Sequence, residues 1–186
     1  MNNAINESEQ LSLTRRCFFT AAGLAVAAPG ASARGPSAAI DNLPHAALLA
    51  DAEVKTYLLE FHTGQEVMQG LLAFAKKYKL EAGHITGIGA ICDAVIGYFD
   101  PEKNAYLRNT EKGQAEVLSL TGNLALNGNE PFFHIHVALG LRDGSARGGH
   151  LFEAKVRPTV ELVLTAYPKP VRRKIDSETG LPLLDP

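Results

Sequence analysis

The 186-residue sequence has few cysteines, no long apolar run and no excess of basic charge. Its 2 cysteines cannot build the disulfide network that stabilises many small secreted domains. No uninterrupted apolar run reaches the roughly 18 residues that a membrane-spanning helix needs. Lys and Arg number 18 against 20 Asp and Glu, so the chain lacks the basic field that binds nucleic acid nonspecifically. The length and the 46% hydrophobic content predict one soluble globular domain with a tail.

The start of the chain has the order of an export signal. Polar residues lead to Arg15-Arg16, a mostly apolar stretch covers residues 18–28, and small residues follow at Ala31-Ser32-Ala33. A charged start, a short apolar middle and an A-x-A end are typical of signal peptides, and the arginine pair resembles the twin-arginine export signal. We therefore expect residues 1–33 to be cleaved after Ala33 and the protein to be periplasmic or otherwise exported, without a stable membrane anchor. The alternative is a buried N-terminal helix that happens to contain two arginines.

The segment after the signal is rich in Ala, Gly and Pro. Residues 34–52 show little periodicity and are interpreted as a linker with one short helical turn near Ala46–Ala52. At the other end, residues 176–186 are rich in turn-forming residues, and we expect them to be loosely packed.

One amphipathic helix is predicted over residues 64–78. Thr63 and Glu66 form a capping-box pattern, and Val67, Leu71 and Phe74 follow at helical spacing. Such a helix packs its apolar side on a sheet.

The rest of the chain predicts strands. Alternating or β-branched segments cover residues 53–61, 84–90, 94–99, 105–109, 116–126, 132–139 and 159–166. Many strands around one helix indicate an α+β domain with a mixed, mostly antiparallel sheet.

Three histidines are the most informative polar residues. His134 and His136 are two positions apart on a predicted strand, which places both rings on one face, about 6–7 Å apart along the chain. Residues 142–144 have the pattern of a three-residue hairpin loop with Gly144 in the left-handed conformation. In that register His150 lies directly opposite His136, with Cβ atoms roughly 5 Å apart.

Two alternatives would change this geometry. A two-residue loop at Asp143-Gly144 would pair His150 with Val137 and turn its ring to the other face. A bulge at Gly148-Gly149 would also shift the pairing.

Three neutral imidazoles on one face suit zinc or another divalent metal, with a fourth position open to water or substrate. That ligand number is typical of catalytic rather than structural zinc sites. The alternative is that the histidines are ordinary polar residues of a sheet face or a subunit contact.

Other polar residues are candidates for the same site. Glu161 or Glu116 could move protons, Asn123 could line a cavity, and Arg157 could bind the carboxylate of a substrate. Each also fits an ordinary solvated strand face.

Several ordered motifs resemble the PPC domain, which is conserved between plants and prokaryotes. They are Gly87-Ile-Gly-Ala-Ile, Gly97-Tyr-Phe-Asp-Pro-Glu-Lys, Glu116-Val-Leu-Ser-Leu-Thr-Gly-Asn, Phe133-His-Ile-His and Gly148-Gly-His-Leu. The resemblance covers residues 53–182 and leaves 183–186 as a tail. It implies an α+β homotrimer in which His134, His136 and His150 hold zinc. Plant members add a basic AT-hook that grips the DNA minor groove; no such motif occurs in this sequence, so DNA binding does not carry over.

The expected architecture and the H-x-H ligand pattern are also similar to those of α-acetolactate decarboxylase and of a family of zinc-dependent ester hydrolases. This resemblance concerns fold and ligand pattern only, so any activity inferred from it is an analogy. Three functions follow as hypotheses. The first is a zinc-dependent lyase or hydrolase acting on a small molecule. The second is a non-catalytic trimer that binds a metal or a small ligand, and the third is DNA binding by family association.

Overall fold

The computed structural model describes residues 45–51 and 54–185, so the predicted export signal lies outside the described part of the chain. The described residues form one helix and one sheet. In chain order the elements are β1 (His45–Asp51), β2 (Lys55–His62), α2 (Val67–Tyr78), β3 (Gly83–Asp100), β4 (Ala105–Asn127), β5 (Glu130–Gly140), β6 (Ala146–Ala166), β7 (Arg172–Ile175) and β8 (Pro182–Asp185). No helix among these elements is long and apolar enough to cross a membrane.

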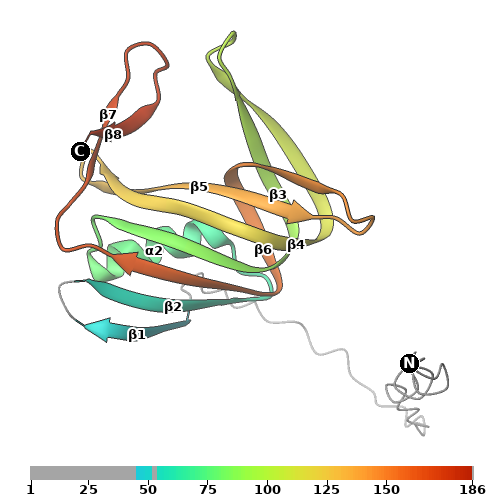
Figure 1. The fold of residues 1–186 in the computed structure, drawn as a ribbon, viewed down its shortest axis with the longest axis horizontal. Coiled ribbons are helices and arrows are strands. Elements are labelled where there is room, and N and C mark those ends of the chain that lie inside the picture. The colour runs from blue at the N-terminus through green and yellow to red at the C-terminus, as the bar shows by residue number, and fades with distance from the viewer. Residues whose placement is uncertain (1–44, 52–53, 186) are drawn as a thin grey trace, which may run out of the picture. The chain divides into compact units, whose positions relative to one another are not determined.

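Four strands of the sheet pair in a closed ring. β6 pairs with β3, β3 with β4, β4 with β5, and β5 returns to the first residues of β6. β2 and β1 extend the sheet from β6, while β7 and β8 extend it from β4. The β4–β7 pair is parallel and the other pairs are antiparallel, so the predicted mixed, mostly antiparallel α+β fold is confirmed for the described residues. Figure 1 shows α2 lying against the sheet and the β3–β4 hairpin projecting from it.

The apolar side of α2 and alternate residues of the strands make the core. Leu71 and Phe74 of α2 are buried, and the Phe74 ring meets Tyr57 of β2 edge to face, with ring centroids 5.2 Å apart. Each large side chain buried in this way contributes about 1.5–3 kcal/mol. Because alternate strand residues face the core, the residues between them face the other side. His84, Asn123 and His134 pair across β3, β4 and β5 and therefore share that second face.

The helix begins later than the capping-box pattern predicts. α2 starts at Val67, and Glu66 is itself the N-cap residue. The Glu66 carboxylate accepts hydrogen bonds from the backbone N–H groups of Met68 and Gln69 at 3.1 and 2.6 Å, and from that of Ala154 in β6 at 2.9 Å. The predicted box is wrong because this carboxylate caps the helix directly and also joins it to β6.

The strand breaks predicted inside residues 84–99 and 105–126 are also wrong. β3 and β4 each run through the Gly-rich or polar segments as one long strand. The β3 ladder shifts register between Gly87 and Gly89 and again between Ile91 and Asp93. Such irregularities let a strand bend without ending, and the sequence pattern records them as interruptions.

Both ends of the described chain are more ordered than predicted. Residues 45–51 form β1, paired with β2 from His45↔Glu60 to Asp51↔Lys55, so the predicted helical turn is wrong. Pairing with a neighbouring strand overrides the helical preference of this Ala-rich segment. At the other end, β8 lies inside the region 176–186 predicted as loose and pairs with β7, which directly precedes that region.

Candidate metal centre

The three predicted histidines come together in the structure. β5 supplies His134 and His136, and β6 supplies His150, which pairs directly with His136. One ring nitrogen from each lies within 4.8 Å of those of the others. Nε2 of His134 and Nε2 of His136 are 3.1 Å apart.

The β5–β6 hairpin sets this arrangement. The N–H of Leu141 donates to the carbonyl of Ser145 at 2.8 Å, and the N–H of Gly144 donates to the carbonyl of Leu141 at 2.9 Å. Gly144 has a φ of 82°, the left-handed conformation that glycine adopts without steric cost. The three-residue loop is therefore confirmed, and the register with His150 opposite Val137 does not occur.

The surroundings of His134 and His150 favour the neutral form of these two imidazoles. Burial, followed by the charges of His134 and His136, lowers the pKa of His150 from 6.5 to about 4. Burial and the neighbouring His136 also lower the pKa of His134. Neutral imidazoles keep a lone pair for a metal ion, so both shifts favour metal binding at neutral pH.

The donor set fits zinc. Nδ1 of His150 is buried and has no hydrogen-bond partner in the described chain. A buried nitrogen without a partner costs free energy unless something binds it. Three imidazole nitrogens are ligands that zinc accepts readily, so the residues present fit the predicted metal.

Asn123 lies beside His134 and contacts an arginine there, although it is not among the residues that line the adjoining cavity. It pairs with His134 across β4 and β5, and its Oδ1 accepts a hydrogen bond from Nη2 of Arg173. Nη1 of Arg173 donates to the carbonyl of Pro182 at 2.8 Å. Only 9% of Arg173 is exposed, and burial lowers the pKa of its guanidinium, although an arginine stays charged at neutral pH.

A largely apolar cavity of about 290 Å³ adjoins the cluster. His134, His150 and Arg173 line it together with aromatic and aliphatic side chains, among them Tyr106, Phe132, Phe152, Met68 and Leu183. The ring of His150 lies 5.0 Å from that of Tyr106 and 4.7 Å from that of Phe152, between centroids. The centre therefore combines three clustered imidazole nitrogens, one buried cation and an apolar wall.

The structure does not bring the other predicted site residues to the cluster. Glu161 is exposed and pairs with Glu60 and Ile88, so β3 and β4 separate it from the β5 histidines. Glu116 is exposed opposite Gly140, four positions beyond His136 along β5. Arg157 is exposed, and its carbonyl accepts a hydrogen bond from Gln114. Strand alternation predicts which face of the sheet Glu161, Glu116 and Arg157 occupy. It does not predict how far along the strand each lies from the histidines.

Sequence reasoning missed the residues of the cavity wall. Phe132 and Phe152 lie two positions from His134 and His150, so strand alternation could have placed them on the same face. Arg173 belongs to the short run 172–174, whose pattern indicates only surface charge. Its burial follows from the parallel pairing of β7 with β4, which local sequence does not predict.

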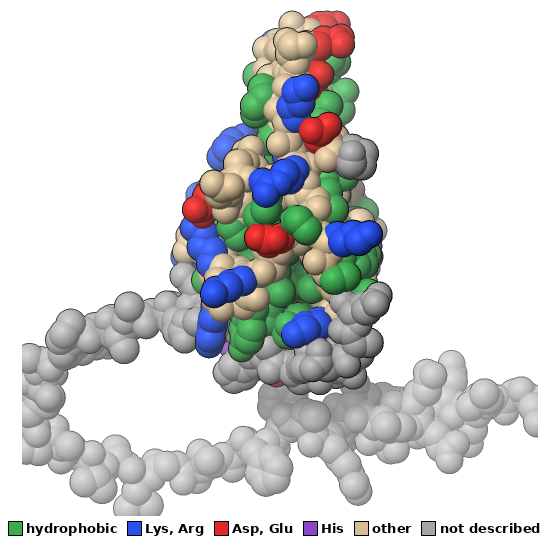
Figure 2. Space-filling model, turned by 90° about the vertical axis from the view of Figure 1, so that its left-hand side faces the viewer, with side chains coloured by type: hydrophobic (Ala, Val, Ile, Leu, Met, Phe, Trp, Pro, Cys, Tyr) green, Lys and Arg blue, Asp and Glu red, His purple; other side chains and the backbone are tan. Residues whose placement is uncertain are grey.

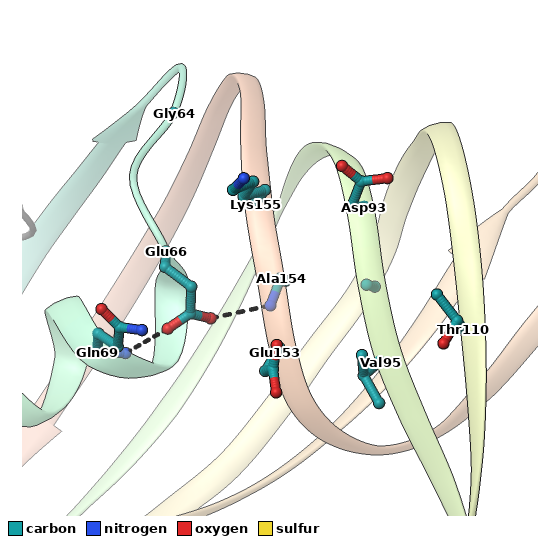
Figure 3. A pocket seen from close by; sticks show the side chains of 10 residues that line it. Gly64, Glu66, Gln69, Asp93, Val95, Thr110, Glu153, Ala154 and Lys155 are labelled. Atoms are coloured by element: carbon teal, nitrogen blue, oxygen red, sulfur yellow. Dashed lines mark hydrogen bonds between the residues drawn. The ribbon is translucent and has the colours of Figure 1, made fainter. Parts of the chain in front are cut away.

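A second cavity, of about 430 Å³, lies away from the histidines. Figure 3 shows the Glu66 carboxylate directed at the backbone of Gln69 and Ala154, with Asp93, Glu153 and Lys155 around the same hollow. Glu66 serves there to cap α2 and to bind β6. The carboxylate of Glu66 in this cavity therefore has a structural role in the fold.

The chain matches one known domain family over most of its described length. A family model described as the Plants and Prokaryotes Conserved (PCC) domain matches residues 50–168. The chain also resembles two curated proteins, each named Bifunctional protein GlmU, from Synechococcus sp. strains JA-3-3Ab and JA-2-3B'a(2-13). It is 29% identical to the first over 118 residues, which are 62% of this chain and 18% of that protein. The chain thus spans about a fifth of the length of these relatives.

Three solved structures share the fold. A metal-containing protein from Archaeoglobus fulgidus is 35% identical, with a TM-score of 0.66, over 77% of this chain and 99% of that one. A plant- and prokaryote-conserved (PPC) protein from Pyrococcus horikoshii is 34% identical, with a TM-score of 0.66, over 76% and 95%. A candidate DNA-binding protein from Bacteroides thetaiotaomicron is 29% identical, with a TM-score of 0.70, over 75% and 96%.

Proposed function

The chain belongs to the Plants and Prokaryotes Conserved (PCC) domain family, and from that premise we propose that it is a metal-binding protein that holds zinc, or another divalent cation, with His134, His136 and His150. The observation that carries the proposal is the approach of three ring nitrogens to within 4.8 Å of one another. The buried Nδ1 of His150, which lacks a partner among the described residues, supports it. So does the relative from Archaeoglobus fulgidus, which is named a metal-containing protein.

The site's own residues suit a small anionic ligand. Zinc with three protein ligands and an open position can polarise a carbonyl group or activate water. Arg173 supplies a positive charge beside the histidines, and Asn123 holds its guanidinium in place. We propose a metal-assisted lyase or hydrolase acting on a small molecule, with a non-catalytic binding trimer as the alternative. Turnover of an ester or a 2-oxo acid by the zinc-loaded protein would favour the enzyme.

Metal analysis tests the proposal. The full chain, loaded with Zn²⁺ and freed of excess metal, should retain about one zinc per chain, as expected for one three-histidine site. The double variant His134→Ala/His136→Ala should lose it. His84→Ala is the matched control, because His84 is exposed on the same face outside the cluster. Circular dichroism verifies that each variant folds, and unchanged zinc in the double variant would disprove the proposal.

We also propose that the chain assembles as a homotrimer through the sheet face that carries the histidines. Leu58 and Ile88 are 43% and 59% exposed. They pair with Val163 and Glu161, which share one face of β6. Exposed apolar side chains gathered on one face are typical of protein interfaces. Light scattering should give three times the mass of one chain, and the mass of a single chain would contradict the trimer.

Export and DNA binding are separate questions. We propose export through the twin-arginine pathway on the evidence of residues 1–33 alone, and mass spectrometry of the exported protein should find Arg34 at its N-terminus.

The relative from Bacteroides thetaiotaomicron is named as a candidate DNA-binding protein. On the face shown in Figure 2, however, Lys and Arg side chains are interspersed with acidic and hydrophobic ones. We therefore do not extend DNA binding to this chain.

A further inference from the structure

We propose that the cavity beside the three histidines binds a small aromatic carboxylic acid. Its ring would lie among Tyr106, Phe132 and Phe152, and its carboxylate would meet the guanidinium of Arg173. The inference rests on the proposed function in one respect, namely that the ligand would lie next to the metal-binding histidines.

Arg173 is a buried cation without an anionic partner. Only 9% of it is exposed, it lines the cavity, and no ion pair to a carboxylate forms within the described chain. A buried charge is costly unless an opposite charge and hydrogen bonds compensate it. Its two known hydrogen bonds, to Asn123 and Pro182, go to neutral oxygens. An anion bound in the cavity would therefore offset the free-energy cost of burying the Arg173 charge.

The unsatisfied polar atoms are concentrated in this one place. Within the described chain, the buried side-chain nitrogens and oxygens that lack a hydrogen-bond partner are Nδ1 of His150 and Nε of Arg173. Both residues line the same cavity. Each such atom in a folded protein calls for an explanation, and an absent ligand is one of the few available. Nδ1 of His150 is accounted for by the proposed metal, whereas Nε of Arg173 calls for a ligand with an acceptor atom.

The size and chemistry of the cavity favour one aromatic ring. Its volume of about 290 Å³ is at the lower end of the range for small-molecule pockets. The rings of Tyr106 and Phe152 meet at 90° with centroids 5.2 Å apart. A further aromatic ring could stack on or meet the edges of these two rings. Such aromatic contacts stabilise a bound ligand more than the burial of its apolar surface alone. Gly97 lets the Phe152 ring lie close to β3, because a Cβ there would lie 2.5 Å from Cε2 of Phe152.

The single positive charge of Arg173 fits a monoanion. Nη1 and Nη2 each make one hydrogen bond to the protein, to Pro182 and Asn123, and Nε makes none in the described chain. The guanidinium therefore keeps N–H donors for a further acceptor, and its single charge is matched by one carboxylate rather than by a doubly charged phosphate. The other nearby guanidinium, Arg108, lies over the Phe152 ring at 4.0 Å and is exposed to solvent.

Titration calorimetry of the zinc-loaded full chain with benzoate tests the inference. Benzoate should bind, whereas benzamide, which lacks the charge, and acetate, which lacks the ring, should bind at least about tenfold more weakly. Arg173→Met should weaken benzoate binding about 10- to 100-fold, because it removes a hydrogen bond to a charged group. Arg172→Met is the matched control, since Arg172 is exposed and donates to the carbonyl of Gly128.

A second variant covers the case in which Arg173→Met does not fold. Phe132→Leu keeps an apolar side chain but removes a ring of the wall, and it should weaken benzoate more than cyclohexanecarboxylate. No benzoate binding by the wild type, or equal binding by Arg173→Met, would overturn the inference. Binding that survives Arg173→Met but vanishes with EDTA would assign the carboxylate to the metal and also overturn it.

Zinc content is measured in the same samples, so the two proposals fail separately. A protein that retains zinc but does not bind benzoate would overturn only the aromatic-acid inference. A protein that binds benzoate through Arg173 but holds no zinc would overturn only the proposed metal site.

Discussion

The side-chain oxygen of Asn123 accepts a hydrogen bond from the guanidinium of Arg173, and this contact brings β4 and β7 together beside the histidines. The two residues are 50 positions apart in the chain. Asn123 is also the cross-strand neighbour of His134. It therefore connects the histidine cluster to the buried cation that adjoins it.

Asn123 is expected to be a positioning residue for Arg173. Asn123→Leu should weaken benzoate binding about 3- to 10-fold, the effect of one neutral hydrogen bond, because Arg173 loses its hydrogen bond to Asn123 and keeps that to Pro182. Zinc content should not change, since Asn123 is outside the cluster. Asn109→Leu, an exposed position of the same strand, is the control. Loss of zinc together with benzoate would instead assign Asn123 a role in building the histidine cluster.

The stability of the metal-free protein should fall as the pH decreases from above 6.5 towards 4. The unfolded chain binds a proton at His150 with the ordinary pKa of 6.5, whereas burial among His134 and His136 lowers the pKa in the folded protein to about 4. Between these values the unfolded state holds more protons, so lowering the pH favours unfolding. Above pH 6.5 this residue adds no pH dependence, and below about 4 its effect is complete.

The free energy of unfolding, measured in urea at several pH values with EDTA present, tests this dependence. His150→Gln should reduce the slope between pH 4 and 6.5, because it removes one of the two histidines whose pKa is lowered; His134, the other, leaves a residual slope. His84→Gln, a change outside the cluster, should keep the slope of the wild type. Identical slopes for all three proteins would show that His150 is not the residue responsible.

Glu66 should contribute strongly to stability. Glu66→Ala removes the cap of α2 and leaves the N–H of Ala154 without its acceptor, for an expected loss of about 2–3 kcal/mol. Chemical denaturation measures the loss, and Glu81→Ala, which removes an exposed carboxylate, should change stability by less than about 0.5 kcal/mol. Zinc content should remain that of the wild type. A loss as small as that of Glu81→Ala would mean that the cap contributes little.

The histidine cluster was predictable because its geometry is local. His134 and His136 share a face through strand alternation, and Gly144 permits the three-residue loop that sets His150 opposite His136. Three short-range rules therefore sufficed to bring the nitrogens together. The same rules failed for Glu66. Its carboxylate caps α2 and also accepts a hydrogen bond from Ala154 of β6, which is 88 residues away in the chain.

By itself, the sequence determined the fold class, the family and the three histidines, because alternation, turn chemistry and ordered motifs are properties of neighbouring residues. Only the tertiary structure decided what surrounds the cluster. The closed ring of β3 to β6 excludes Glu161 and Glu116 from the site, and the pairing of β7 with β4 brings in Arg173. These are contacts between segments far apart in the chain, and they depend on how the whole sheet closes rather than on any local pattern.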